Sequence, residues 1–379
     1  MNWKTVRFGD LYEEDSRNGL TKPSKVRGSG YKMINMGELF SNDRIYDIPM
    51  ELVPLKENDK KAKVESGDLL FARQSLVLEG AGKCSIVMET SPLTVFESHI
   101  IRVRLNSAKA NPLFYYYYFK SPYSAVKTIV SQCAQAGIRG SDLQELNVIH
   151  PEIDEQNRIA ESLSYYDDLI ENNQKQIKLL EEAAQRLYKE WFVDLRFPGH
   201  EDVQIVDGVP EGWKQSKVTE LLEIKYGKDH KALEDGKIPV YGSGGVMRRV
   251  KQILYSGESV LIPRKGSLNN ILYVDCDFWT IDTMFYSIPR MKDVAKYSYL
   301  YLITRDMYSF NIGAAVPSMT TKILDGMDIL LPDETALAKF ETAVSPLFEK
   351  KKLLEKQNEQ LTEARDRLLP KLMSGEIEL

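Results

Sequence analysis

The stretch Leu180-Glu181-Glu182-Ala183-Ala184-Gln185-Arg186-Leu187 decides the fold, because its pattern returns near the end of the chain as Leu361-Thr362-Glu363-Ala364-Arg365-Asp366-Arg367-Leu368. Leucine, glutamate, alanine, arginine and leucine occupy the same places in both octapeptides, at an offset of 181 residues. The same offset carries Pro151 onto Pro332. A repeat of this length predicts two copies of one structural unit in tandem.

Each octapeptide belongs to a longer helical pattern. Apolar residues recur at spacings of three and four between Leu163 and Trp191, and the pattern repeats between Val344 and Leu372. This period predicts a heptad seam, and so narrow an apolar stripe must be covered by another helix. We therefore predict an antiparallel coiled coil, related by a pseudo-twofold axis, with the seam residues Leu163, Ile170, Asn173, Ile177, Leu180 and Leu187 in the first helix and Leu347, Leu354, Asn358, Leu361 and Leu368 in the second.

The two asparagines of the predicted seam offer a check on its register. If the axis passes near the middle of the helices, Asn173 faces Asn358, and one buried amide pair can fix the register of a coiled coil. Hydration of both amides at the edges of the seam is the open alternative.

The globular parts are also duplicated. Trp3-Lys4 returns as Trp213-Lys214, and Ser66-Gly67-Asp68 returns as Ser256-Gly257-Glu258. The offset falls from 210 at the first of these pairs to 181 at the helices, so the first copy has extra residues in its globular part. Short β-branched or aromatic runs between glycine-rich turns predict strands at 69–72, 86–88, 100–103, 260–262 and 271–274, with helices at 112–130 and 297–308.

These patterns predict an α+β fold in which two tandem mixed α/β domains are each followed by a long α-helix. The predicted boundaries are 1–152 for the first domain, 153–195 for the first connecting helix, 196–332 for the second domain, and 333–379 for the second helix with its C-terminal tail. A chain of 379 residues, of which 43% are hydrophobic, can build two such cores.

Composition excludes several classes of protein. The chain starts without an apolar leader, and no window offers the about 18 apolar residues of a membrane span, so we expect a cytoplasmic protein with no membrane partner. Cys84, Cys133 and Cys276 lie far apart, which predicts buried thiols and neither a disulfide framework nor a cysteine zinc site. The four histidines show no metal-ligand spacing, so no metal site is predicted.

Charge is unevenly distributed along the chain. The net charge of −5 is unfavourable for a protein that binds polyanions. Residues 1–150, however, have 20 Lys and Arg against 17 Asp and Glu, whereas residues 151–199 have 6 against 11. The acidic excess therefore lies mainly in the helical stretches, and the globular parts are close to neutral or mildly basic.

Several fragments imitate catalytic motifs, and none is complete. Asn111-Pro112-Leu113-Phe114 is similar to the Asn-Pro-Pro-Phe loop of adenine methyltransferases, but no glycine-rich cofactor loop accompanies it and Pro112 suits the first turn of a helix. Gly80-Ala81-Gly82-Lys83-Cys84 lacks the first glycine and the Ser or Thr of a phosphate-binding loop. Asp333 and Glu349 match letters of a nuclease motif, but both fall in a predicted helix, so they cannot converge on a metal. The sequence predicts no catalytic residue.

The order of these elements resembles that of type I restriction-modification system specificity subunits. Four phrases add to the likeness: LYKEWFVD at 187–194, VPEGW at 209–213, YGSGG at 241–245 and RLLPKLMSGEI at 367–377. The resemblance covers nearly the whole chain. One departure is the pair Ala336-Leu337, which stands where the first copy has Glu155-Gln156.

The resemblance implies a non-catalytic, sequence-specific reader of double-stranded DNA. Each globular part would be a target-recognition domain for one half-site of a bipartite target, and the helices would set the spacer. Two modification subunits would dock on the chain and methylate adenine at N6, using S-adenosylmethionine that they bind themselves. Two restriction subunits, motor nucleases that use ATP and magnesium, can join this complex, and the chain itself would bind no cofactor.

Loops with polar side chains at matching places in both copies are the candidate DNA contacts. Guanidinium and amide groups can read guanine and adenine edges, whereas lysine runs contact phosphates. We expect Arg73-Gln74-Ser75 and the matching Arg264-Lys265-Gly266-Ser267 to read bases. The full set is Lys60, Lys61, Lys63, Arg73, Gln74, Ser75, Arg139 and Ser141 in the first copy, and Tyr241, Gly242, Ser243, Gly244, Arg248, Arg249, Lys251, Arg264, Lys265, Ser267, Asn269, Asn270, Thr320 and Lys322 in the second.

Structural alternatives accompany these assignments. The arginine loops could be solvated turns, the basic runs could be plain surface, and Tyr241–Gly245 could be an ordinary hairpin. The cluster Tyr115–Tyr118 could stack on bases, but its neighbours Phe114 and Phe119 favour a packed helix face. For the whole chain, the alternative function is a coiled-coil scaffold whose two domains bind proteins, which explains the helices but gives the matched loops no role.

Overall fold

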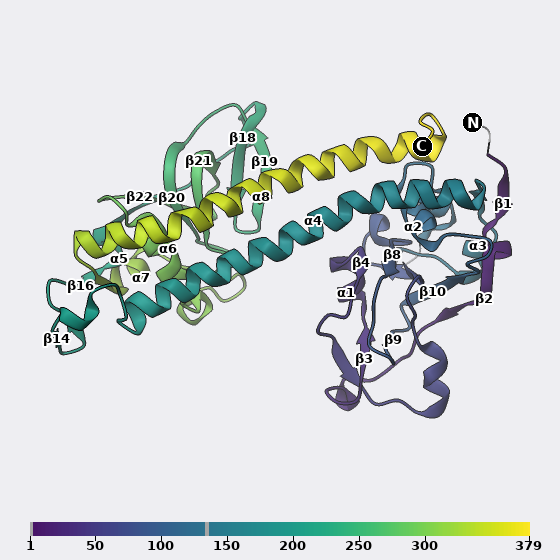
Figure 1. The fold of residues 1–379 in the computed structure, drawn as a ribbon, viewed down its shortest axis with the longest axis horizontal. Helices are drawn as coiled ribbons and strands as arrows, with labels where there is room; N and C mark the ends of the chain where they lie inside the picture. The colour runs from purple at the N-terminus through teal and green to yellow at the C-terminus, as the bar shows by residue number, and fades with distance from the viewer. Residues whose placement is uncertain (1–2, 133–135) are drawn as a thin grey trace. The chain divides into compact units, whose positions relative to one another are not determined.

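The computed structural model describes residues 3–132 and 136–379. The chain forms two compact units, residues 1–172 with 357–379 and residues 173–356. Each unit combines one globular domain with one end of each of the two long helices, α4 (Ile153–Tyr188) and α8 (Glu334–Ser374) (Figure 1). The units divide the chain within these helices, so the predicted domain boundaries stay a prediction.

The first unit is built on a five-stranded sheet with the order β2-β10-β6-β8-β4. Neighbouring strands are antiparallel except β4, which runs parallel to β8. Helix α2 (Pro112–Lys120) packs against this sheet through a core that includes Phe8, Phe71 and Phe114. The strands are β2 (Tyr12–Asn18), β4 (Arg44–Ile45), β6 (Leu69–Ala72), β8 (Cys84–Val87) and β10 (Ile100–Leu105).

The second unit repeats this topology. Its six-stranded sheet has the order β17-β22-β20-β21-β18-β19, and β18 runs parallel to β21 as β4 does to β8. Helix α6 (Ala295–Ile303) takes the place of α2. The strands are β17 (Leu222–Tyr226), β18 (Asp235–Gly242), β19 (Gly245–Val250), β20 (Tyr255–Pro263), β21 (Leu272–Thr280) and β22 (Met284–Pro289).

Smaller elements match between the units as well. A two-stranded pair closes each globular part: β1 (Thr5–Arg7) with β13 (Asn147–Ile149), and β16 (Lys214–Lys217) with β23 (Asp328–Leu331). The indole N–H of Trp3 donates to Glu155 at 3.2 Å, and that of Trp213 donates to Asp333 at 3.1 Å. In both copies the tryptophan therefore joins the start of the domain to the start of the following helix, and the duplication expected from the sequence is confirmed.

The extra residues of the first copy form a separate small sheet. It has the order β5-β3-β9, and its apolar residues Met33, Val53 and Phe96 share one core with Leu70 and Val87 of the five-stranded sheet. Its elements are β3 (Tyr31–Ile34), α1 (Met36–Ser41), β5 (Glu51–Val53) and β9 (Val95–Phe96). The longer offset at the start of the repeat thus reflects an inserted layer in the first domain.

The predicted seam runs along both long helices. Leu163, Ile170, Asn173 and Leu354 are buried, and the other predicted seam residues, Ile177, Leu180, Leu187, Leu347, Asn358, Leu361 and Leu368, are half-buried. In the first unit Asp167 of α4 pairs with Arg365 of α8, and in the second Glu181 pairs with Lys351 at 2.7 Å. In the second unit the rings of Tyr188 and Phe340 also lie 6.5 Å apart, so the two helices are antiparallel in that unit. Asn173 and Asn358 belong to different units, so their pairing and the pseudo-twofold relation stay predictions.

Three local expectations need correction. The helix expected at 112–130 ends at Lys120, because Ser121 precedes Pro122 and proline disfavours helical backbone in the residue before it. The helix expected at 297–308 is α6, which begins and ends earlier. Cys84 is buried as expected, whereas Cys276 is exposed on β21, and Cys133 lies outside the described residues.

Candidate nucleic-acid interface

The Arg73 loop is the best-defined candidate in the first unit. Arg73 lies between β6 and the short strand β7 (Gln74–Ser75), which pairs with β12 (Ala136–Gly137). Its backbone N–H donates to the His99 carbonyl at 2.8 Å, and its carbonyl accepts from Ile138 N–H at 2.9 Å. The fold thus brings Arg73-Gln74-Ser75 beside the stretch that leads to Arg139, although the two are far apart in the sequence.

The Arg264 loop has the same backbone register in the second unit. The backbone N–H of Arg264 donates to the Thr283 carbonyl at 2.8 Å, and the Arg264 carbonyl accepts from Met319 N–H at 2.9 Å. The next residue, Lys265, forms a β-bridge with Ser318. The side chains match too, since one guanidinium N–H of Arg73 donates to the Ser98 carbonyl at 3.3 Å and one of Arg264 to the Asp282 carbonyl at 3.1 Å. A guanidinium has five N–H donors, so this anchoring leaves capacity to bind a base or phosphate.

The segments after Ile138 and Met319 also correspond. Arg139 is exposed and immediately precedes α3 (Gly140–Gln144), as Thr320 precedes α7 (Thr321–Gly326). Ser141 and Lys322 are exposed within these short helices. The candidates Arg139, Ser141, Thr320 and Lys322 therefore adjoin the arginine loop of their own unit.

The hairpin of the second unit lies against its arginine loop. Gly242 pairs with Gly245 across the β18–β19 turn, so Tyr241–Gly245 is a hairpin. The side-chain amide of Asn270 donates to the Ser243 carbonyl at 2.8 Å. Gly266 has φ +86°, and a Cβ there would lie 2.8 Å from Ser243 Oγ, so a side chain at this position would be strained and crowded. Tyr241, Gly242, Ser243, Gly244, Lys265, Ser267 and Asn270 thus gather in one place.

Two candidates also have local structural roles. Ser75 Oγ accepts the N–H of Val77 at 3.2 Å, which stabilises the turn after β7. Asn269 accepts the N–H of Met307 at 2.7 Å and donates to Asp306 at 3.2 Å. These contacts occupy polar atoms of Ser75 and Asn269, two side chains that were predicted from the sequence to contact DNA.

The basic runs are largely compensated by acidic neighbours. Lys60 pairs with Glu57 at 2.7 Å and Lys63 with Glu65 at 3.2 Å, while Lys61 is exposed. The hydrogen bond that the Lys60 ammonium donates to the Glu57 carboxylate raises the pKa of Lys60. In the second unit, Arg248 pairs with Asp235, Lys251 pairs with Glu234, and Arg249 donates to the Lys237 carbonyl. The net positive potential around the two basic runs, Lys60–Lys63 and Arg248–Lys251, is therefore smaller than the sequence suggests. Contact of these runs with phosphates stays a prediction.

The imitations of catalytic and stacking motifs have structural explanations. Asn111 caps α2, since its side-chain oxygen accepts from Leu113 N–H at 2.8 Å and from Phe114 N–H at 3.2 Å. Tyr115–Tyr118 are all buried, which confirms the packed helix face. Within residues 3–132 and 136–379, no cluster of three or more His, Cys, Asp or Glu could hold a metal ion.

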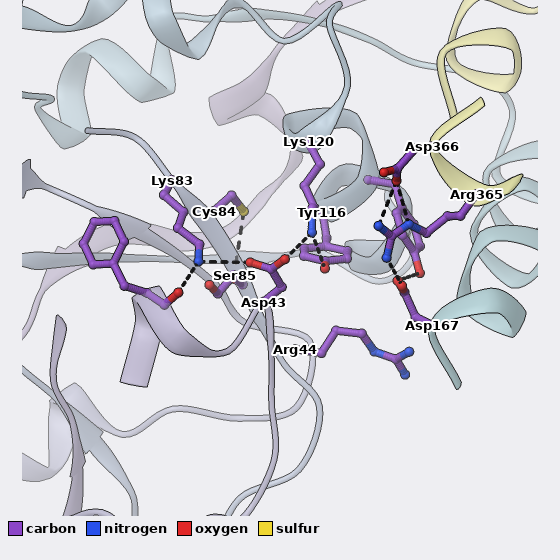
Figure 2. Close-up of polar contacts among 12 residues, drawn as sticks. Asp43, Arg44, Lys83, Cys84, Ser85, Tyr116, Lys120, Asp167, Arg365 and Asp366 are labelled. Carbon is purple, nitrogen blue, oxygen red and sulfur yellow. Dashed lines mark hydrogen bonds and ion pairs between the residues drawn. The ribbon is translucent and has the colours of Figure 1, made fainter. Parts of the chain in front are cut away.

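A polar network that the sequence did not single out joins the first domain to the helices (Figure 2). The Tyr117 hydroxyl of α2 donates to Asp167 of α4 at 2.6 Å. The same carboxylate pairs with Arg365 of α8, as Figure 2 shows. Arg365 follows the predicted seam residue Leu361 by four residues and precedes Leu368 by three, so a charged residue at a heptad position was the signal that could have revealed it. These two contacts connect α2, α4 and α8 within one unit.

A second part of the network surrounds Asp43, which precedes β4. Figure 2 shows its carboxylate between Lys83 and Lys120, at 3.0 and 2.5 Å. Burial acts to raise the pKa of Asp43, but the two ammonium groups outweigh it and the pKa lies below the usual value. The adjoining Arg44 pairs with Asp168 of α4 at 2.6 Å. This part of the network attaches the edge of the sheet to the helix.

No helix in the described part of the chain has the length and apolar character that a membrane span needs. The cytoplasmic location inferred from the sequence stays a prediction.

Comparison with known proteins identifies the family. The model described as "Type I restriction modification DNA specificity domain" matches residues 1–182 and 210–363. The type I restriction enzyme MjaIX specificity subunit of Methanocaldococcus jannaschii is 26% identical over 412 residues, which cover 99% of this chain and 94% of that protein. The HindI specificity subunit of Haemophilus influenzae is 21% identical over 469 residues, which cover 99% of this chain and 100% of that protein.

The fold is similar to a solved structure of the same kind. The type I restriction-modification S subunit from M. genitalium matches with a TM-score of 0.61 and 20% identity, covering 98% of this chain and 96% of that one. Because the family model matches both copies of the repeat, the chain belongs to the family of type I restriction-modification specificity subunits.

Proposed function

We propose that this chain reads a bipartite DNA target, with one half-site for each mixed α/β domain. The observation that carries the proposal is the shared register of the Arg73 and Arg264 loops, each of which is held between two backbone partners in its own unit. Rigid loops at equivalent places suit two readers of one duplex. Joining two short recognition events on one chain also raises specificity far above that of either alone.

In this proposal the helices set the spacer and the chain recruits its catalysts. Two modification subunits would methylate adenine at N6 with their own S-adenosylmethionine, and two restriction subunits would bring ATP and magnesium. This chain would supply neither a catalytic residue nor a cofactor. Asn111 caps α2 and Tyr115–Tyr118 are buried, so these residues have structural roles. This supports a chain that leaves catalysis to its partner subunits.

The test is co-expression with an adenine methyltransferase subunit of a type I restriction-modification system from the same genome, followed by sequencing of the methylated genome. We expect one motif with two specified halves, a gap of fixed length, and a methylated adenine in each half. Methylation of the same motif without this chain would favour the scaffold alternative.

Two loop variants sharpen the test. Arg73→Lys and Arg264→Lys keep the charge but lose the guanidinium fork, so each should relax the base preference at one position by roughly 10- to 100-fold. The two variants should affect different half-sites. Arg186→Lys, an exposed residue on α4, is the matched control and should leave the motif unchanged. Relaxation of the same half-site by both loop variants would contradict one domain for each half.

A further inference from the structure

The loop after β7 displays three consecutive apolar side chains to solvent. Leu76, Val77 and Leu78 are 89%, 59% and 45% exposed. Single exposed apolar residues are common, but a run of three departs from the usual surface pattern unless a partner covers it.

The base of this loop is firmly held. Gly82 N–H donates to the Ala72 carbonyl at 2.9 Å, and the Lys127 ammonium donates to the carbonyls of Glu79 and Ala81 at 2.6 and 2.8 Å. Lys83, at the end of the loop, donates to the Phe40 carbonyl at 2.7 Å. The apolar tip is therefore displayed by an anchored loop.

The exposed apolar tip, Leu76–Leu78, directly follows β7, which contains the candidate base contacts Gln74 and Ser75. Leu76 follows Ser75, and β7 pairs with the strand that leads to the exposed Arg139. The loop has one acidic side chain, Glu79, against the cations Arg73, Arg139 and Lys127 nearby in the fold. These surroundings therefore suit a partner that is a polyanion and also exposes an apolar group where the loop contacts it.

The second copy does not share this feature. In the equivalent loop after Arg264 and Lys265, Leu268 is fully buried with 0% exposure. The exposed tip is therefore not a requirement of the repeated fold, and it distinguishes the first domain from the second.

We propose that Leu76, with Val77 and Leu78 beside it, contacts thymine methyl groups in the major groove of the half-site bound by the first domain. The inference rests on the proposed function. The thymine 5-methyl group is the apolar group that base pairs present in this groove, and contact with a leucine side chain removes both surfaces from water. The loop then adds apolar specificity to the polar contacts of Arg73 and Gln74.

The test measures binding of the complete complex with its methyltransferase subunits to the duplex target. Each thymine of the target is replaced in turn by deoxyuridine, which lacks the methyl group. Removal of the contacted methyl should weaken wild-type binding about fourfold, the change that corresponds to about 0.8 kcal/mol for one buried carbon group. Leu76→Ser and Leu76→Ala should bind the thymine duplex more weakly and be indifferent to the same replacement.

The matched control is Val206→Ser, which changes an apolar residue that is 63% exposed on another hairpin. It should keep the full dependence on the methyl group. If the Leu76 variants retain the wild-type methyl dependence, the inference is wrong while the proposed function stands. Loss of assembly with the methyltransferase would also overturn it, because the loop would then contact protein. If the wild-type complex does not distinguish the target from an unrelated duplex, the proposed function itself fails.

Discussion

Among single residues, Asp167 has two partners that depend on its charge. It is buried on α4, accepts the Tyr117 hydroxyl and pairs with Arg365. Asp167→Ala should lower the free energy of unfolding of the first unit by roughly 3 kcal/mol, because it leaves a guanidinium and a hydroxyl without their acceptor in a largely buried place. Urea denaturation, with hydrogen exchange of the α2 and α4 amides, measures this change.

An exposed ion pair on the same helix provides the control. Glu182 and Arg186 are 3.8 Å apart and both reach solvent. Glu182→Ala should cost no more than about 0.5 kcal/mol, since surface pairs contribute little. Equal losses in Asp167→Ala and Glu182→Ala would mean that the network in Figure 2 does not hold the helices to the domain.

At the scale of elements, the N-terminal cap of α2 allows a structural role of Asn111 to be distinguished from a catalytic one. Asn111→Ala removes the cap and should destabilise the first unit by about 1 kcal/mol. Asn111→Asp keeps the capping oxygen and should remain close to wild type in thermal stability. A methyltransferase would lose activity in both variants, whereas here methylation by the assembled complex should survive in both. Loss of methylation in a stable Asn111→Asp complex would reopen the enzyme interpretation.

At the scale of the whole molecule, the proposed spacing function depends on helix length. Inserting seven residues near Asn173 and seven near Asn358 preserves the heptad and lengthens each helix by about 10 Å. At about 3.4 Å for each base pair, the gap in the methylated motif should grow by about three base pairs, with both half-sites unchanged. Methylome sequencing reads the gap directly. An unaltered gap would refute the helices as the spacer.

A single insertion is the control for that experiment. Seven extra residues in α4 alone displace part of its apolar seam by one heptad relative to the seam of α8. The two helices then lose their pairing in one of the units. We expect loss of stability and of methylation, without a new gap. A longer gap from one insertion would show that the two helices do not work as a matched pair.

The sequence alone was sufficient for the repeated architecture. The octapeptide repeat, the heptad spacing and the short β-branched runs predicted two α+β domains with two long helices, and β6, α4 and the buried tyrosines follow those patterns. Such features are encoded by neighbours along the chain, because one period of a helix or strand spans only a few residues. Where a local breaker intervened, as at Pro122, the boundary moved.

Tertiary structure was needed to bring distant loops and charges together. Gln74 lies beside Gly137, Arg248 pairs with Asp235, and Asp167 meets Arg365 through strand register and helix pairing. Neither the exposure of Leu76 nor the burial of Leu268 could be foreseen, since both leucines follow similar arginine loops. The physical reason is that burial, ion pairing and cross-strand neighbours depend on residues far apart in the chain, which no local period specifies.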